Sequence, residues 1–377
     1  TIEYSTKAMA LAEKEAQEWN DPEVHAGLSV TDIIAVLREC LNEALSQYLT
    51  GDDGMMPYTF LQDELMDRLG MSSHSLNMIY KGLMDHGEMI AEIKKSKKKL
   101  PRSYILSLGR FLSAWNTADE ETNIFLIVGG ENPKFQAYCL DPRAAAEPLR
   151  SCRSSIHMSG TLSPLSDYTE EIGLPEAAER IFPSPFPAEN LKILYVNDVS
   201  TKFDEFNNIP EVYERMKDHI ISIAGAVDRN TAVFFPSYSI MERFLRDDTL
   251  ERIGKDAFIE RKGMTQPELM EEVSLFKLSE GSILFAITGG RISEGLDFPD
   301  KDMEMAILVG IPYPKPTAKQ EALRRYYDMR FGNGWERSSK IPAMRKMRQA
   351  IGRLIRSETD RGMAVILDRR VFNLEDI

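Results

Sequence analysis

Residues 283–298 read Ile-Leu-Phe-Ala-Ile-Thr-Gly-Gly-Arg-Ile-Ser-Glu-Gly-Leu-Asp-Phe, an apolar run followed at once by a glycine-rich, polar stretch. Five consecutive apolar residues are typical of a strand buried on both faces of a parallel sheet. Glycines directly after such a strand place a loop at the carboxyl edge of the sheet, where open α/β folds bind ligands. Backbone amides freed by the glycines can hold phosphate or ribose, and Glu294 and Asp297 can accept from ribose hydroxyls or order water near a metal. The alternative is a plain β-turn that carries acidic residues and binds no ligand.

Apolar runs of the same kind occur before and after this stretch. Further apolar runs occur at 193–196, 232–235, 306–309 and 364–367, and helical patterns occur at 209–226, 238–254, 266–278 and 342–356. Strands that alternate with helices in this way predict a doubly wound α/β domain from about residue 190 to the end. Additional strands are predicted at 124–128, 135–140 and 155–158.

The first 120 residues predict helices only. Ile34, Leu37 and Leu41 recur at spacings of three and four, which indicates one stripe of an amphipathic helix. Thr59 and Gln62 form a capping box for another helix. An all-α domain is therefore expected before the α/β domain.

Length and composition exclude several classes of protein. A chain of 377 residues with 43% hydrophobic content suits two or three globular domains. Cys40, Cys139 and Cys152 are too few and too scattered for a disulfide framework or a four-thiolate metal site, and the five histidines lack metal-ligand spacing. No apolar run approaches the roughly 20 residues that span a bilayer, and no secretory signal is visible. A cytoplasmic protein, or a nuclear one in a eukaryote, is expected, and a chain beginning with Thr is expected to be part of a longer one.

The charge is distributed unevenly. Residues 311–361 hold 13 Lys and Arg against five Asp and Glu, inside a chain of net charge −13. A basic zone on an acidic body usually meets phosphate. Four aromatic residues in the zone could stack on bases: Tyr313, Tyr326, Tyr327 and Trp335. Solvated helix faces with local ion pairs are the alternative. The lysine cluster at 94–99 is either a mobile loop or a nucleic-acid contact.

Residues 349–356, Gln-Ala-Ile-Gly-Arg-Leu-Ile-Arg, carry the strongest chemical signal. Arg353 and Arg356 are three residues apart on a predicted helix, so both guanidiniums should project from the same face of that helix. Gly352 lets another surface approach closely, and Gln349 precedes it by one turn. Cations for a γ-phosphate and a polar group that places water are what phosphoryl transfer needs.

Two other strand ends carry polar residues. Ser159 and Thr161 follow the predicted strand 155–158 and could couple a nucleotide pocket to a nearby groove. Ser237 is the expected N-cap of a helix that begins at Tyr238, where a helix N-terminus could bind a nucleic-acid phosphate. Helix capping alone explains Ser237 equally well.

Taken in order, these motifs resemble the C-terminal part of the XPD (xeroderma pigmentosum group D) family of superfamily 2 DNA helicases, which has bacterial DinG among its relatives. The matching pieces, similar to helicase motifs III to VI, are SGTLSP at 159–164, FFPSY at 234–238, GGRISEGLDF at 289–298, GIPYP at 310–314 and QAIGRLIR at 349–356. The resemblance implies a RecA-like, doubly wound parallel sheet domain preceded by an all-α inserted Arch domain. It divides the chain into a helical Arch-like domain (1–121), closing strands of the first RecA-like motor domain with motif III (122–175) and the second motor domain (176–377).

The resemblance also implies ATP-driven movement along single-stranded DNA, with 5′-to-3′ unwinding in nucleotide excision repair. It makes Gln349, Arg353 and Arg356 the catalytic residues at the γ-phosphate, and it places Gly352, Glu294, Gly295 and Asp297 in the nucleotide cleft. The implied DNA-groove residues are Ser237, Tyr238, Arg291, Ser293, Ser159 and Thr161. Single-stranded DNA, the DNA fork and repair-complex proteins are the implied partners.

Some parts of the family pattern are absent from the sequence. The one Gly-Lys pair, Gly254-Lys255, precedes Asp256, so there is no P-loop, and four cysteines for the family's 4Fe-4S cluster are lacking. ATP and Mg²⁺ are therefore expected to bind jointly with a missing N-terminal motor domain, and the chain alone should be inactive. The alternatives are a non-catalytic nucleic-acid-binding or scaffold module, or a nucleotide-dependent transferase, for which the sequence assembles no acid/base constellation.

Overall fold

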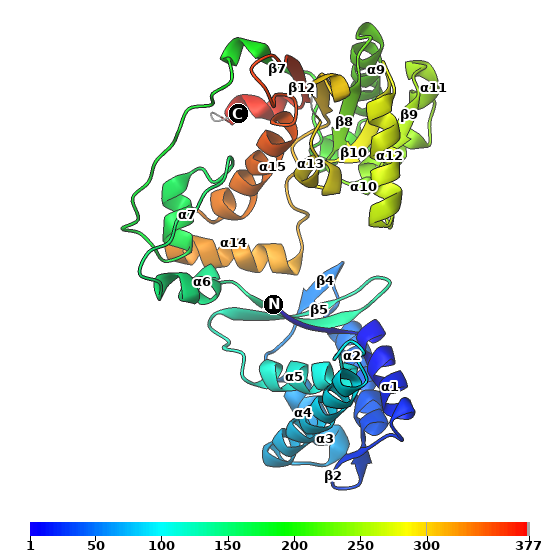
Figure 1. Ribbon diagram of the computed structural model, residues 1–377, viewed down its shortest axis with the longest axis vertical. Coiled ribbons are helices and arrows are strands. Elements are labelled where there is room, and N and C mark those ends of the chain that lie inside the picture. Colours follow the sequence, from blue (N-terminus) through cyan, green and yellow to red (C-terminus); the bar gives the residue numbers. More distant parts are fainter. Residues whose placement is uncertain (299, 375–377) are drawn as a thin grey trace. The chain divides into compact units, whose positions relative to one another are not determined.

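The computed structural model describes residues 1–298 and 300–374, which form two compact units (Figure 1). The first unit comprises Thr1–Ser154, Glu171–Gly173 and Lys315–Gly334, and the second comprises Ser155–Glu170, Leu174–Pro314 and Trp335–Ile377. Among the residues described, the helices are all too short or too polar to cross a bilayer.

The first unit is mainly helical. Its helices are α1 (Thr6–Glu18), α2 (Val30–Tyr48), α3 (Phe60–Leu69), α4 (Ser73–Ser96), α5 (Tyr104–Asn116), α6 (Pro142–Arg150) and α14 (Ala318–Phe331). An antiparallel sheet of order β1-β6-β5-β4 contains β1 (Ile2–Ser5), β4 (Asp53–Met55), β5 (Asn123–Val128) and β6 (Lys134–Cys139), and β2 (Glu23–His25) pairs with β3 (Leu28–Ser29).

The structure confirms a helical region but adds strands that the sequence analysis missed. The strands β1 to β4 have only two to four residues each, too few to show an alternating pattern. Because β5 and β6 pair with β4 and β1, the compact unit continues past the predicted boundary at residue 121, to Ser154.

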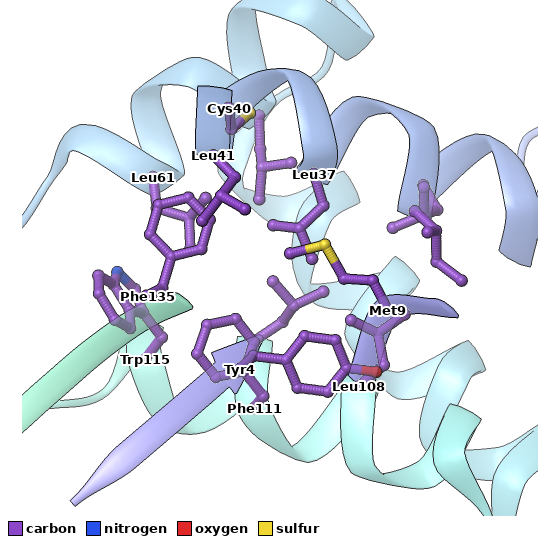
Figure 2. Close-up of a cluster of buried hydrophobic side chains, with 14 of the residues drawn as sticks. Tyr4, Met9, Leu37, Cys40, Leu41, Leu61, Leu108, Phe111, Trp115 and Phe135 are labelled. Atoms are coloured by element: carbon purple, nitrogen blue, oxygen red, sulfur yellow. The ribbon is translucent and has the colours of Figure 1, made fainter. Parts of the chain in front are cut away.

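The core of this unit is aromatic where the sheet meets the helices (Figure 2). The rings of Tyr4 on β1 and Phe111 on α5 stack with centroids 5.1 Å apart. Trp115, one turn further along α5, meets Phe135 of β6 edge-on at 5.8 Å. The aromatic pairs therefore join strands at both ends of the helical segment to the same helix.

A buried carboxylate ties α1 to the beginning of α5. Glu15 is 3% exposed, and its Oε2 accepts hydrogen bonds from the backbone amides of Tyr104 at 2.6 Å and Ile105 at 2.9 Å. Its Oε1 pairs with Lys94 Nζ at 2.5 Å. At least one lysine of the 94–99 cluster is therefore a structural partner of an acidic side chain.

We expect Glu15→Ala to destabilise the first unit by about 3–5 kcal/mol, because it leaves a cation and helix-terminal amides without their buried partner. Glu13→Ala is the matched control, since Glu13 lies on the same helix in a partly exposed pair with Arg38 and should lose about 1 kcal/mol or less. Urea unfolding followed by tryptophan fluorescence measures both. Equal losses for the two variants would contradict the assigned role of Glu15.

The second unit contains a parallel sheet flanked by helices. The strands β7 (Leu191–Val196), β8 (Thr231–Phe235), β9 (Ala257–Ile259), β10 (Ile283–Ile287), β11 (Met305–Leu308) and β12 (Gly362–Leu367) form the order β7-β12-β11-β8-β10-β9. The helices are α7 (Leu165–Glu171), α8 (Phe203–Asn208), α9 (Pro210–Ala226), α10 (Tyr238–Leu245), α11 (Thr249–Ile253), α12 (Gln266–Leu278), α13 (Arg291–Gly295) and α15 (Ile341–Ile351). All strand pairs are parallel, which confirms the predicted doubly wound fold.

Alternate residues of the central strands β8, β10 and β11 are buried on opposite faces of the sheet. On β10, Leu284 and Ala286 pack in a cluster with residues of α12, α13 and α15. Phe285 and Ile287 pack instead in a cluster with residues of α8, α9 and α10. Both faces are therefore apolar at the centre of the sheet, which explains why the central strands read as continuous apolar runs.

Two predicted elements differ in the structure. Residues 155–158 form no strand, and Ile156 and Met158 are each 86% exposed, since no described strand pairs with this segment. The predicted helix 238–254 is two helices, α10 and α11, because Asp247 turns the chain by accepting a hydrogen bond from the Thr249 amide at 2.9 Å.

Candidate functional site

The carboxyl ends of β8, β9 and β10 meet at a buried carboxylate, that of Glu260. This residue follows β9 and is 1% exposed; its Oε1 accepts from Tyr238 Oη at 2.9 Å and its Oε2 from the Ile287 amide at 3.1 Å. Burial, with the nearby Glu260 charge, raises the pKa of Tyr238 to about 12, so the phenol remains a donor at neutral pH. Glu260 carries no signal in the sequence, because the strand before it has only three residues and shows no pattern.

Gly289 and Gly290 lie at this junction, where a side chain would not fit. Gly289 has a φ of +75°, and a Cβ there would lie 2.7 Å from Lys346 Cδ. A Cβ on Gly290 would lie 2.9 Å from the carbonyl oxygen of Ile287. The two glycines therefore allow α13 to begin directly after β10, with Arg291 exposed at its first position.

The residues predicted to line a DNA groove differ in their exposure to solvent. Ser237 caps α10, since its Oγ accepts from the Ile240 amide at 3.3 Å, and it is only partly buried. Ser293 is fully buried, and its Oγ donates to the Gly290 carbonyl at 3.1 Å. A buried hydroxyl engaged in its own helix does not meet DNA, which corrects the expectation for Ser293.

A second group lies where β11 and β12 end. Asp368 is fully buried and accepts hydrogen bonds from the Thr201 amide at 3.0 Å and from Arg370 Nε at 2.9 Å. The Arg370 guanidinium lies 5.5 Å from the ring centroid of Tyr313. That ring is 5.7 Å from the ring of Trp335, which is 50% exposed. A cation and two aromatic rings thus form one surface at the carboxyl edge of the sheet.

The part of the predicted basic zone that lies on α14 does not form such a surface. Tyr326 and Tyr327 are only 9% and 8% exposed in the core of the first unit, so neither is available to stack on bases. On the same helix, Arg324 and Arg325 both pair with Glu321. For α14 the alternative of local ion pairs is therefore the correct interpretation.

The helix α15 is shorter than predicted. It ends at Ile351, and Arg353 and Arg356 lie in the turn that follows, so no shared helical face brings them together. Their guanidiniums converge instead on Asp297 Oδ1, at 3.2 Å from Arg353 Nη1 and 2.9 Å from Arg356 Nη2. Burial is the main cause that lowers the pKa of Arg353, and the positive charge of the neighbouring Arg356 lowers it further.

Arg353 is also tied to the backbone at the end of α13. Its Nε donates to the Ser293 carbonyl at 2.9 Å and its Nη2 to the Glu294 carbonyl at 2.6 Å. Lys277, in the last turn of α12 shortly before β10 begins, donates to the Asp297 carbonyl. The second half of the glycine-rich stretch therefore lies toward the amino ends of the strands, away from the carboxyl edge at which the glycines lie.

An open pocket of about 680 Å³ runs along this turn. Its lining includes Gln349, Gly352, Arg353 and Arg356, together with Gly160 and Thr161 and the apolar Leu191 and Ile193 of β7. Amide, guanidinium and hydroxyl groups therefore line the same pocket as a set of apolar side chains. A nucleotide, with its charged phosphates and apolar base, has this combination of chemical properties.

Ser159 and Thr161 belong with this pocket. Ser159 Oγ accepts from the Thr161 amide at 3.2 Å, which orders the turn that brings Thr161 to the pocket wall. Both residues were predicted as DNA contacts, and the structure associates Thr161 with Gln349 and Arg353 instead.

The cysteines do not fit an iron–sulfur cluster. Cys40 lies in the core shown in Figure 2, and burial raises the pKa of its thiol to about 12. Cys139 donates to the Asp141 carbonyl, and Cys152 is exposed. In the part of the chain that the structure describes, no three His, Cys, Asp or Glu side chains gather in a metal-binding group.

Two family models match the sequence in succession. A model of the helical and beta-bridge domain matches residues 12–205, just over half of the chain. A model of the helicase C-terminal domain matches residues 220–375, which include β8 to β12 and the turn after α15.

Curated relatives share part of their length with this chain. A regulator of telomere elongation helicase 1 homolog from Drosophila persimilis is 29% identical over 262 residues, which cover 62% of this chain and 25% of the relative. The homolog from Anopheles gambiae is 26% identical over 263 residues, 63% of this chain and 26% of the relative. The chain thus spans about a quarter of the curated relatives it matches.

Solved structures share the fold. An XPD helicase superposes with a TM-score of 0.64 at 21% identity, covering 99% of this chain and 62% of the other. The Xpd4 protein of S. tokodaii superposes with a TM-score of 0.64 at 16% identity, covering 98% of this chain and 68% of the other.

We expect Asp368→Asn to lower stability at neutral pH and to flatten its acid dependence. Burial alone would raise the pKa of Asp368, but hydrogen bonds from Arg370 and the Thr201 amide outweigh it and hold this pKa below its usual value. Such a carboxylate contributes stability above its unfolded pKa of about 4, and this contribution is lost as the pH falls through the lower folded pKa.

Urea unfolding between pH 3 and pH 7 measures this dependence. The exposed Asp204→Asn on α8 is the control for removal of one carboxylate. Identical acid slopes for the wild type and Asp368→Asn would contradict the assigned role of Asp368.

Proposed function

Because the chain belongs to the XPD family of DNA helicases, as the C-terminal part of such a protein, we propose that it forms the second lobe of an ATP-driven motor on DNA. In this proposal residues 176–377 are the second motor domain, and residues 1–121 contain the inserted Arch domain. The strands in 122–175 close the first motor domain. The pairing of β1 with β6 supports an insertion, since the chain leaves one sheet before the helices and returns to it afterwards.

The observation that carries the nucleotide role is the pocket shared by Gln349, Arg353 and Arg356. Two planar guanidiniums can hold phosphate oxygens at a γ-phosphate, and an amide can orient the attacking water. ATP with Mg²⁺ supplies the phosphoryl group whose transfer to water drives the motor. Since the sequence lacks a P-loop, the N-terminal motor domain of the whole protein would hold most of the nucleotide, and this chain would not hydrolyse ATP alone.

We expect Arg353→Ala and Arg356→Ala, each in the complete enzyme, to lower DNA-stimulated ATP hydrolysis by about 10³–10⁵-fold. Binding of single-stranded DNA should remain, because neither guanidinium lies at the carboxyl edge of the sheet. Arg361→Ala, an exposed arginine at the end of the same turn, is the control and should keep full activity. Phosphate release with and without DNA measures the rates, and unchanged turnover in both variants would remove the nucleotide role.

We propose that the carboxyl edge of the sheet forms part of a groove for single-stranded DNA at a fork. Arg291 is exposed there, near the partly buried Tyr238, and the surface of Arg370, Tyr313 and Trp335 follows the neighbouring strands. Cations track the phosphate backbone, and aromatic rings accept stacked bases. Unwinding with 5′-to-3′ polarity, nucleotide excision repair with partner proteins, and a cytoplasmic or nuclear location belong to this proposal through the family.

We expect Arg291→Ala to weaken binding of single-stranded DNA while DNA-independent ATP hydrolysis stays unchanged. The slope of log affinity against log salt should become shallower by about one unit, because one phosphate contact is lost. Arg246→Ala is the matched control, since Arg246 lies exposed at the far end of α10 and pairs with Glu242. If Arg291→Ala leaves affinity and slope at wild-type values, this part of the groove is wrongly assigned.

A further inference from the structure

The two arginines of the candidate nucleotide site are held in unequal ways. Arg353 makes three side-chain contacts: two with backbone carbonyls of α13 and one with Asp297. Arg356 makes its side-chain ion pair with Asp297, and its side chain is 36% exposed against 13% for Arg353. Releasing Arg353 would leave two carbonyls without their donor, whereas Arg356 can turn away at the cost of one exposed ion pair.

From this asymmetry, and resting on the proposed nucleotide site, we propose that Asp297 is a latch that holds Arg356 away from the nucleotide until a phosphate replaces it. Arg353 is then the fixed arginine, whose hydrogen bonds to the end of α13 keep its guanidinium in place at the site. Arg356 is the mobile arginine that transfers from the carboxylate to the nucleotide phosphate. Asp297 acts through Arg356 and is a positioning residue, not a nucleotide ligand.

The position of Asp297 suits this role. Its carboxylate is 74% exposed, so the ion pair with Arg356 lies in water and is weak enough to exchange for a phosphate. Its backbone is anchored, because the Asp297 carbonyl accepts from Lys277. The backbone amide of Arg356 is likewise anchored by Asp360 Oδ2 at 2.6 Å, so exchange requires movement of the side chain alone.

The charges also favour an exchange. Two guanidiniums that share one carboxylate oxygen repel each other, and Asp297 compensates only part of that repulsion. A phosphate carries more negative charge than a carboxylate and accepts a bidentate fork from arginine. Phosphate and Asp297 therefore compete for Arg356, and the carboxylate lowers the apparent affinity for ATP.

The test is Asp297→Asn in the complete enzyme, which removes the charge and keeps the shape. We expect the KM for ATP to fall by about two- to fivefold, the size expected from an exposed ion pair, while kcat changes by less than about twofold. Glu358→Gln is the matched control, because Glu358 is an exposed carboxylate two residues after Arg356. A nucleotide-binding role for Asp297 predicts a higher KM, and a purely structural role predicts a lower kcat at unchanged KM; either outcome overturns the latch.

A double-variant comparison shows whether Asp297 acts through Arg356. The dissociation constant of a non-hydrolysable ATP analogue is measured for Asp297→Asn, Arg356→Ala and the double variant. We expect the gain in affinity from Asp297→Asn to disappear when Arg356 is already absent. A gain that persists in the double variant overturns the latch. If Arg353→Ala and Arg356→Ala both leave ATP turnover unchanged, the nucleotide site itself fails; if they abolish turnover while Asp297→Asn has no effect, only the latch fails.

Discussion

The guanidinium of Arg353 joins the two segments on which the candidate nucleotide site depends. Its hydrogen bonds to the carbonyls of Ser293 and Glu294 attach the turn after α15 to the end of α13. Gln349, near the end of α15, and the turn that carries Arg356 are thereby held beside α13, although the helix itself ends at residue 351. A partly buried cation that satisfies backbone carbonyls is costly to move, and this cost keeps the site in one arrangement.

The parallel sheet separates two kinds of chemistry in space. Its carboxyl edge carries the buried carboxylates Glu260 and Asp368, which order a partly exposed cationic and aromatic surface. Toward the amino ends of the strands lies the pocket of Gln349 and the arginines. The glycine-rich stretch after β10 reaches both regions, since its glycines lie at one end and Asp297 at the other. The five-residue helix α13 connects the two regions along the chain.

In the first unit, too, a buried polar side chain holds several elements together. Glu15 connects three elements through its two oxygens, and the stacked rings of Tyr4 and Phe111 join the edge of the sheet to α5. The helices are thereby fixed to strands that flank them in the sequence.

The sequence by itself determined the doubly wound parallel sheet and the segments that hold the candidate site, because continuous apolar runs and glycines after a strand leave few other folds. It also identified Gln349, Arg353 and Arg356 as a chemical unit. Their convergence arises differently from the prediction: the helix ends before the arginines, and Asp297 draws the two guanidiniums together. Only the tertiary structure decided that Ser293 is buried, that Tyr326 and Tyr327 belong to a core, and that Glu260 joins three strand ends. The physical reason is that the spacing of apolar residues indicates only the local secondary structure. Burial and hydrogen-bond partners depend on residues that are far away in the sequence.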